Sequence, residues 1–120
     1  MKYKIDVVRI RENSITLNGW AIGKSPDSRA TFRVEDEKHK PVKFKHVNTR
    51  RDDVSQIYFK KVLDREFGFD IQFPYERGKS YYLLIRCEGK QARIKFNEEL
   101  IAKRASVAHK RMEKIKDLMN

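Results

Sequence analysis

Residues 67–96 read FGFDIQFPYERGKSYYLLIRCEGKQARIKF, and their apolar pattern gives the clearest prediction of the fold. The stretch contains three segments in which every second residue is apolar and the residues between are mostly polar, a pattern typical of strands with one buried face. Two turn-forming segments, Pro74 to Lys79 and Glu88-Gly89-Lys90, separate the three predicted strands. The inward sets are Phe67, Phe69, Ile71 and Phe73, then Tyr81, Leu83, Ile85 and Cys87, then Ala92, Ile94 and Phe96.

The chain before residue 67 predicts four more strands of the same kind. They cover residues 2–10, 14–22, 29–35 and 41–47. In the first of them the apolar positions change phase between Val7 and Val8, which predicts a β-bulge. About seven short strands at this spacing predict a mainly β fold, an antiparallel immunoglobulin-like β-sandwich, and leave the order of its strands open.

Two segments depart from the alternation and favour helix. Within residues 48–61 the apolar spacing suits a short helical turn, and after Phe96 the apolar period becomes that of an α-helix, with Asn97 as the expected N-cap. We therefore divide the chain into a sandwich domain, residues 1–96, and an amphipathic helix, residues 97–120, that leads toward a further domain. The helix is expected to pack its first half on the sandwich, or to pair two chains as a short coiled coil. Its apolar seam consists of Ile101, Ala105, Ala108, Met112, Ile115 and Met119.

The chain is strongly basic. It has 28 Lys and Arg against 17 Asp and Glu, a formal net charge of +11. This excess leaves three partners open: nucleic acid, an anionic membrane surface, or a phosphate-bearing substrate. Nucleic acid is disfavoured because the strand aromatics alternate into the core and no recognition motif is present. The residues expected to contact a membrane or phosphate are Lys38, Lys40, Lys43 and Lys45.

The sequence also predicts a compartment. Cys87 is the single cysteine and cannot form an internal disulfide, which favours a reducing environment. The charged start lacks the apolar stretch of a signal peptide, and no run of about 18 apolar residues occurs. We expect a cytoplasmic protein, placed at the inner face of the membrane if its basic surface binds lipid.

The sequence contains no recognisable catalytic, metal or cofactor site. His39, His46 and His109 are not at metal-ligand spacing from one another or from Cys87. Asp52 and Asp53 are adjacent carboxylates, but the preceding Arg50 and Arg51 favour local ion pairs or capping of the short helix over a cation.

The aromatic residues raise a separate possibility. Trp20 is the single tryptophan, and a core anchor is the favoured interpretation. A sugar-binding platform on Trp20 or on the pair Tyr81-Tyr82 is the alternative, and it would require exposed rings.

Several motifs together resemble the start of bacterial family 2 glycosyltransferases. They are Asn18-Gly19-Trp20-Ala21, then Arg50-Arg51-Asp52-Asp53-Val54 with Ile57-Tyr58-Phe59, then Phe67-Gly68-Phe69, and finally Ser106-Val107-Ala108-His109-Lys110-Arg111. The resemblance runs in order over nearly the whole chain. It implies an accessory β-sandwich ahead of a nucleotide-sugar-dependent catalytic domain, in enzymes that build rhamnose-containing or related cell-wall and capsular polysaccharides of Gram-positive bacteria. The Asp-x-Asp motif of such a catalytic domain is absent from these 120 residues.

The resulting expectation is a non-catalytic module that positions a glycosyltransferase relative to its acceptor, its membrane or a partner. Its partners would be the downstream catalytic domain, an anionic membrane or glycan, and a second copy through the helix. Trp20, Arg50, Arg51, Asp52, Asp53 and Tyr58 form the expected binding or structural motif. A carbohydrate-binding module and a basic nucleic-acid-binding domain are the alternatives.

Overall fold

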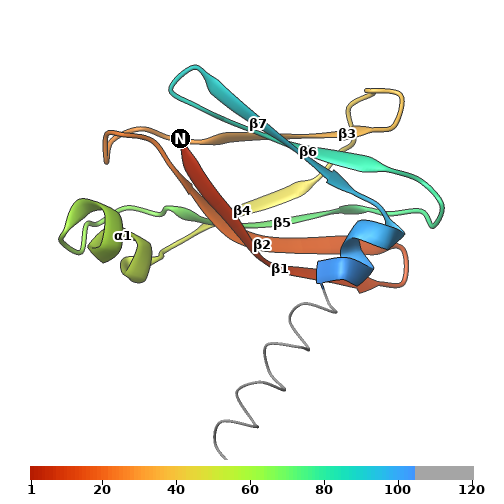
Figure 1. Cartoon of the computed structure of the whole chain (residues 1–120), viewed down its shortest axis with the longest axis horizontal. Coiled ribbons are helices and arrows are strands. Elements are labelled where there is room, and N and C mark those ends of the chain that lie inside the picture. Colours follow the sequence, from red (N-terminus) through yellow and green to blue (C-terminus); the bar gives the residue numbers. More distant parts are fainter. Residues whose placement is uncertain (105–120) are drawn as a thin grey trace, which may run out of the picture.

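The computed structural model describes residues 1–104 as two antiparallel sheets facing each other (Figure 1). A helix of eight residues, α1 (Asp52–Phe59), lies at one end of the sandwich. The strands are β1 (Lys2–Arg11), β2 (Ser14–Ile22), β3 (Thr31–Asp36), β4 (Lys45–Thr49), β5 (Gly68–Pro74), β6 (Tyr81–Cys87) and β7 (Lys90–Phe96). The mainly β sandwich of seven strands is thus confirmed.

The strand order is that of an immunoglobulin constant-type domain. One sheet has the order β1-β2-β5-β4 and the other β3-β6-β7, with every neighbouring pair antiparallel. In the lettering of immunoglobulin domains these sheets correspond to A-B-E-D and C-F-G. The order places the β2–β3 loop, the β4–β5 connection and the β6–β7 hairpin at the same end of the molecule.

The fourth strand begins later than residue 41, where the alternation predicts it. The backbone N–H of Val42 donates to Val34 O at 2.8 Å, and Pro41 forms an isolated bridge with Glu35, so this segment still follows β3. Pro41 has no N–H to extend that pairing. The chain then crosses to the other sheet, where Lys45–Thr49 pair with β5.

The main core lies between the sheets, on the inward faces that the alternation predicts. Phe67 is the exception, because it precedes β5 and packs in a separate, smaller core. Phe69 sits near the centre of the main core at 1% exposure, and its ring centroid is 4.6 Å from that of Phe32 on the opposite sheet. Cys87 is buried and free, as expected of a small apolar side chain. The fully buried side chains of this core are Ile15, Leu17, Val34, Phe69, Ile71, Phe73, Leu83, Ile85 and Phe96.

The predicted β1 bulge is present, one residue earlier than the change of phase indicates, and the predicted β6–β7 hairpin is present as well. The register of β1 against β2 shifts between Ile5 and Val7, which moves Val8 onto the core face. Glu88 and Gly89 both have positive φ and join β6 to β7 as a two-residue turn, the geometry of a type I′ hairpin.

A tyrosine ties the turn between β5 and β6 to the sandwich. The Tyr81 hydroxyl at the start of β6 accepts a hydrogen bond from the backbone N–H of Glu76 at 3.0 Å, while its ring packs against Phe73 and Tyr75. Immunoglobulin domains carry a tyrosine of this kind at the same corner. The sequence predicted Tyr81 as an inward residue but not this bond.

Tyr81→Phe is expected to lower the free energy of unfolding by about 1 kcal/mol, because the Glu76 N–H loses its acceptor while the packing stays the same. Chemical denaturation measures this loss. Tyr82→Phe is the matched control, since Tyr82 faces outward on the same strand and its hydroxyl has no such role; equal effects of the two changes would contradict the assignment.

A second, smaller core attaches α1 to the outer side of the four-stranded sheet. Trp20 and Ile22 point away from the main core and pack with Val54 of α1 and with Phe67, which precedes β5. The buried Ser55 hydroxyl donates to Lys61 O and accepts from the Leu63 N–H, both at 2.8 Å. These two hydrogen bonds hold the segment that follows α1 against the helix. The helical turn predicted within residues 48–61 is thus a two-turn helix anchored by Val54.

The C-terminal helix begins as predicted. Asn97 Oδ1 accepts a hydrogen bond from the Leu100 N–H at 2.8 Å, as an N-cap does, and Ile101 packs against the main core. Ala105, Ala108, Met112, Ile115 and Met119, and with them the predicted coiled-coil seam, lie outside the described residues. None of the helices in residues 1–104 has the length and apolar character needed to cross a membrane.

Candidate binding sites

The expected Arg50–Asp53 motif is an ion-pair network that fastens the start of α1. The Arg51 guanidinium contacts Asp6 of β1 at 2.7 Å and Asp53 at 2.8 Å, and Arg50 contacts Asp52 at 2.7 Å. The hydrogen bonds that the Arg51 guanidinium donates to Asp53 and Asp6 raise the pKa of Arg51. The local ion pairs that the sequence favoured are therefore present, and one of them reaches the neighbouring sheet.

Asp53 is held mainly by a side chain rather than by backbone. The Arg51 hydrogen bonds lower the pKa of Asp53 to about 2, with a smaller contribution from the Val54 N–H. The residue before the helix, Arg51, makes no side-chain cap. The expected role of the Asp53 carboxylate as a cap of α1 is thus minor. Asp52 and Asp53 instead form ion pairs with Arg50 and Arg51. Within residues 1–104, no three metal-ligating side chains converge.

The candidate stacking rings are not free. Trp20 is 7% exposed, and its ring centroid lies 5.2 Å from that of Tyr58, which covers it. Tyr81 is buried. Tyr82 faces outward but has the Arg93 guanidinium 4.1 Å from its ring centroid. Trp20 and Tyr81 are therefore core residues, and neither ring can support a sugar.

The four candidate lysines are spread along the chain from the turn after β3 to the first residue of β4. Lys38 and Lys40 border one shallow depression, beside Glu37 and Glu76, whereas Lys43 and Lys45 border another, beside Gln72. The backbone N–H groups of Lys40 and Lys38 donate to the Asp36 carboxylate at 2.9 and 2.8 Å, which lowers the pKa of Asp36. These lysines belong to a carboxylate-stabilised turn and its continuation.

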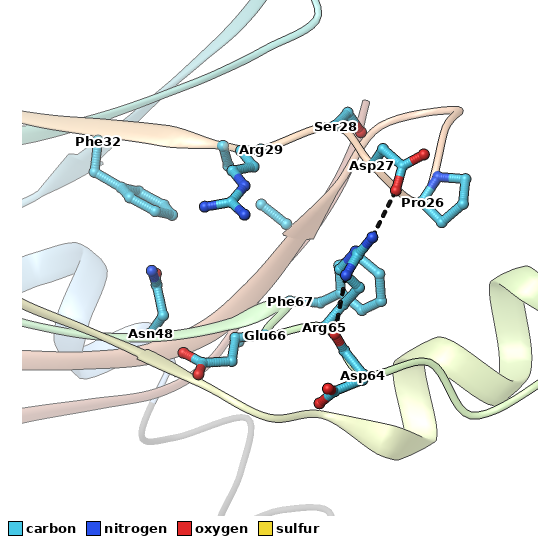
Figure 2. A pocket seen from close by; sticks show the side chains of 13 residues that line it. Pro26, Asp27, Ser28, Arg29, Phe32, Asn48, Asp64, Arg65, Glu66 and Phe67 are labelled. Atoms are coloured by element: carbon cyan, nitrogen blue, oxygen red, sulfur yellow. Dashed lines mark hydrogen bonds and ion pairs between the residues drawn. The ribbon is translucent and has the colours of Figure 1, made fainter.

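A hollow of about 410 Å³ lies at the α1 end of the sandwich. Figure 2 shows its lining side chains. The β2–β3 loop forms one wall and the segment between α1 and β5 forms the other. Its volume is in the range of small-molecule sites, roughly 300 to 1,000 Å³. The lining residues are Ala21, Pro26, Asp27, Ser28, Arg29, Ala30, Phe32, Asn48, Asp64, Arg65, Glu66, Phe67 and Gly68.

The two walls of this end hollow are joined by an ion pair. Arg65 Nη2 lies 2.8 Å from Asp27 Oδ1, and Arg65 Nη1 donates to the Asp64 carbonyl at 3.2 Å (Figure 2). A second link fixes the same loop from the other side, because the Glu88 carboxylate of the β6–β7 turn accepts a hydrogen bond from the Lys24 N–H. The loops around the hollow are therefore held in place by side-chain contacts.

The interior of the end hollow offers donors and acceptors together. The Arg29 guanidinium, the Asn48 amide and the Glu66 carboxylate face it from three different elements, and the Phe32 ring lies beside them (Figure 2). Arg29 and Glu66 make no ion pair with any residue of the described range 1–104. Such a set can donate to, and accept from, a neutral polyhydroxyl ligand while an aromatic edge contacts its apolar side.

The sequence did not indicate this hollow. Arg29, Asn48 and Glu66 are separated along the chain and follow no motif, so only the strand order brings them together. The signal that could have found it is the pair of polar segments Pro26 to Ser28 and Asp64 to Glu66, each directly before a predicted strand.

No protein-family model matches this sequence, and no curated protein matches it either.

Proposed function

We propose that this domain is a non-catalytic module of a bacterial family 2 glycosyltransferase, and that it positions the enzyme by holding a segment of the acceptor glycan in the end hollow. The observation that carries the proposal is the arrangement of Arg29, Asn48 and Glu66 beside Phe32. Sugar hydroxyls both donate and accept hydrogen bonds, and this site supplies both kinds of partner.

The location of the hollow supports the proposal. It lies among the β2–β3 and β4–β5 connections, at the end of the sandwich that also carries the β6–β7 turn. Variable immunoglobulin domains place their binding loops at this end. A rigid sandwich with linked loops loses little conformational entropy when it binds a ligand. Such a module would act at the inner face of the membrane if its basic surface binds lipid.

The link to a glycosyltransferase rests on the motifs from Asn18 to Arg111, and the natural reading frame tests it. A following domain that bears an Asp-x-Asp motif supports the proposal. A frame that stops at Asn120, or that continues into a domain of another class, contradicts it.

Arg29→Ala is expected to weaken binding of a rhamnose oligosaccharide by about tenfold or more, because a charged hydrogen-bond donor is lost from the site. Isothermal titration calorimetry measures the affinity. Arg77→Ala is the matched control, since it removes the same charge from the turn between β5 and β6 at the opposite end of the sandwich. Equal affinities of the two variants, or no binding by the unmodified protein at millimolar ligand, would contradict the proposed site.

A further inference from the structure

The outer face of the three-stranded sheet carries a two-dimensional array of cations. The strand register aligns Thr31 with Arg86 and Gln91, Arg33 with Leu84 and Arg93, and Glu35 with Tyr82 and Lys95. We call the four exposed cations Arg33, Arg86, Arg93 and Lys95 the basic face. Strand spacing of about 5 Å and alternate residues about 7 Å apart place all four within an area of roughly 10 by 14 Å.

The charges of the basic face are little compensated. Glu35 is the acidic residue among the nine outward positions, and its carboxylate lies 3.7 Å from Arg33 Nε. Arg86, Arg93 and Lys95 form no ion pair with a carboxylate of residues 1–104. Arg93 is held in position by the Tyr82 ring beneath it and by His39 Nδ1, 2.6 Å from its Nη2.

The other sheet presents a different outer surface. The outward residues of its two central strands are Thr16 and Asn18 on β2 and Asp70 and Gln72 on β5, with Asn18 donating to Asp70. At one end this surface is covered by α1. The two edge strands of this sheet carry cations on the same outer side, among them Lys4, Arg9, Arg11 and Lys45. Its cations therefore lie at the margins, around a neutral or acidic centre, whereas those of the basic face extend over all three strands of their sheet.

The shape of the basic face discriminates between anionic partners. Single-stranded nucleic acid is bound by grooves that follow its backbone and by aromatic rings on which bases stack. Here the cations are spread over a flat sheet in two directions, and the guanidinium of Arg93 already occupies the Tyr82 ring. A flat array of cations is complementary to a plane of phosphate headgroups, and arginine binds phosphate through two parallel hydrogen bonds.

We infer that the basic face docks this domain on an anionic lipid bilayer. Lys38, Lys40, Lys43 and Lys45, which the sequence suggested for this role, are not part of the array. None of the four residues of the basic face lines the end hollow, so lipid binding and glycan binding can fail independently.

Sedimentation with lipid vesicles tests the inference on the whole chain. We expect binding to vesicles of phosphatidylcholine with phosphatidylglycerol, weakening with added salt, and little binding to phosphatidylcholine alone. Each Lys or Arg near an anionic surface contributes about fivefold in affinity. The double variant Arg86→Gln with Lys95→Gln should therefore bind about thirtyfold more weakly.

The matched control is Lys43→Gln with Lys45→Gln, which removes the same charge from outside the basic face and should retain most of the binding. Both variants alter exposed side chains, and their thermal melting curves verify folding. Equal loss in the two variants would overturn the assignment of the face. Binding to a single-stranded oligouridylate that depends on Arg86 and Lys95, without binding to anionic vesicles, would overturn it in favour of nucleic acid.

Discussion

Trp20→Ala should lower the free energy of unfolding by about 3 to 5 kcal/mol, the usual cost of removing a large aromatic side chain from a core. Trp20 is 7% exposed and joins Ile22, Val54 and Phe67 in the core that attaches α1 to the sheet. For a domain of about 100 residues this loss lowers the melting temperature by more than about 10 °C. Urea denaturation followed by circular dichroism measures both the stability and the remaining structure.

Tyr58→Ala serves as the control for this substitution. Tyr58 contacts Trp20 but is 36% exposed, so its removal should cost only about 1 kcal/mol. A Trp20→Ala protein with unchanged stability would mean that the indole is not a core residue, and would restore the platform interpretation of this ring.

Gly19→Ala should also be strongly destabilising, by about 3 kcal/mol or more, which is the upper end for overpacking substitutions. A Cβ atom on Gly19 would lie 2.2 Å from the backbone carbonyl of Lys4 and 3.2 Å from the Cα of Ile5, beside the β1 bulge. Because these atoms belong to the backbone, β1 would have to move away from β2. Denaturation midpoints of the two proteins measure the effect.

Gly23→Ala is the matched control for this prediction. A Cβ atom there would meet the side-chain ends of Glu88 and Ser28, which can rotate away. We expect a clearly smaller loss of stability than at Gly19. A Gly19→Ala protein as stable as the Gly23→Ala protein would show that the β1–β2 contact is looser than the structure has it.

The strands could be predicted because each one carries its own period of two. The alternation around Phe69, Leu83 and Ile94 indicates the inward face of each strand even when the neighbouring strands are unknown. The bulge near Val7 can be predicted from the change of phase in the apolar positions. The start of β4 could not be predicted in this way, because Pro41 and Val42 continue the alternation while their hydrogen bonds still follow β3. Pairing partners decide strand ends, and the alternation does not specify them.

The candidate surfaces were harder to predict because they depend on strand order. The sequence directs attention to Lys38 through Arg51, where basic residues are densest, yet the array on the sheet combines Arg33, Arg86 and Arg93 from three strands. Only the order β3-β6-β7 makes them neighbours. Arg29 and Glu66 in the end hollow likewise become neighbours only through the fold, because they are far apart in the sequence. Local ion pairs such as Arg51 with Asp53 could be predicted, since residues two apart in the chain are already close.

Two surfaces of one sandwich would bind two kinds of ligand. The end hollow, with Arg29 and Glu66, would hold a neutral polyhydroxyl chain, and the basic face would hold the domain on phosphate headgroups. A catalytic domain joined to such a module would be kept near both its membrane and its acceptor. This arrangement would raise the effective concentration of the acceptor without any chemistry in the module itself.

Two-dimensional 1H–15N NMR during titration with a rhamnose oligosaccharide tests the central claim most directly, because it locates binding residue by residue. The account predicts that the amide signals of Arg29, Asn48 and Glu66 shift together and saturate, while those of Arg77 and of the basic face stay in place. Shifts confined to other residues, or no saturable shift at millimolar ligand, would contradict the claim that the end hollow binds glycan.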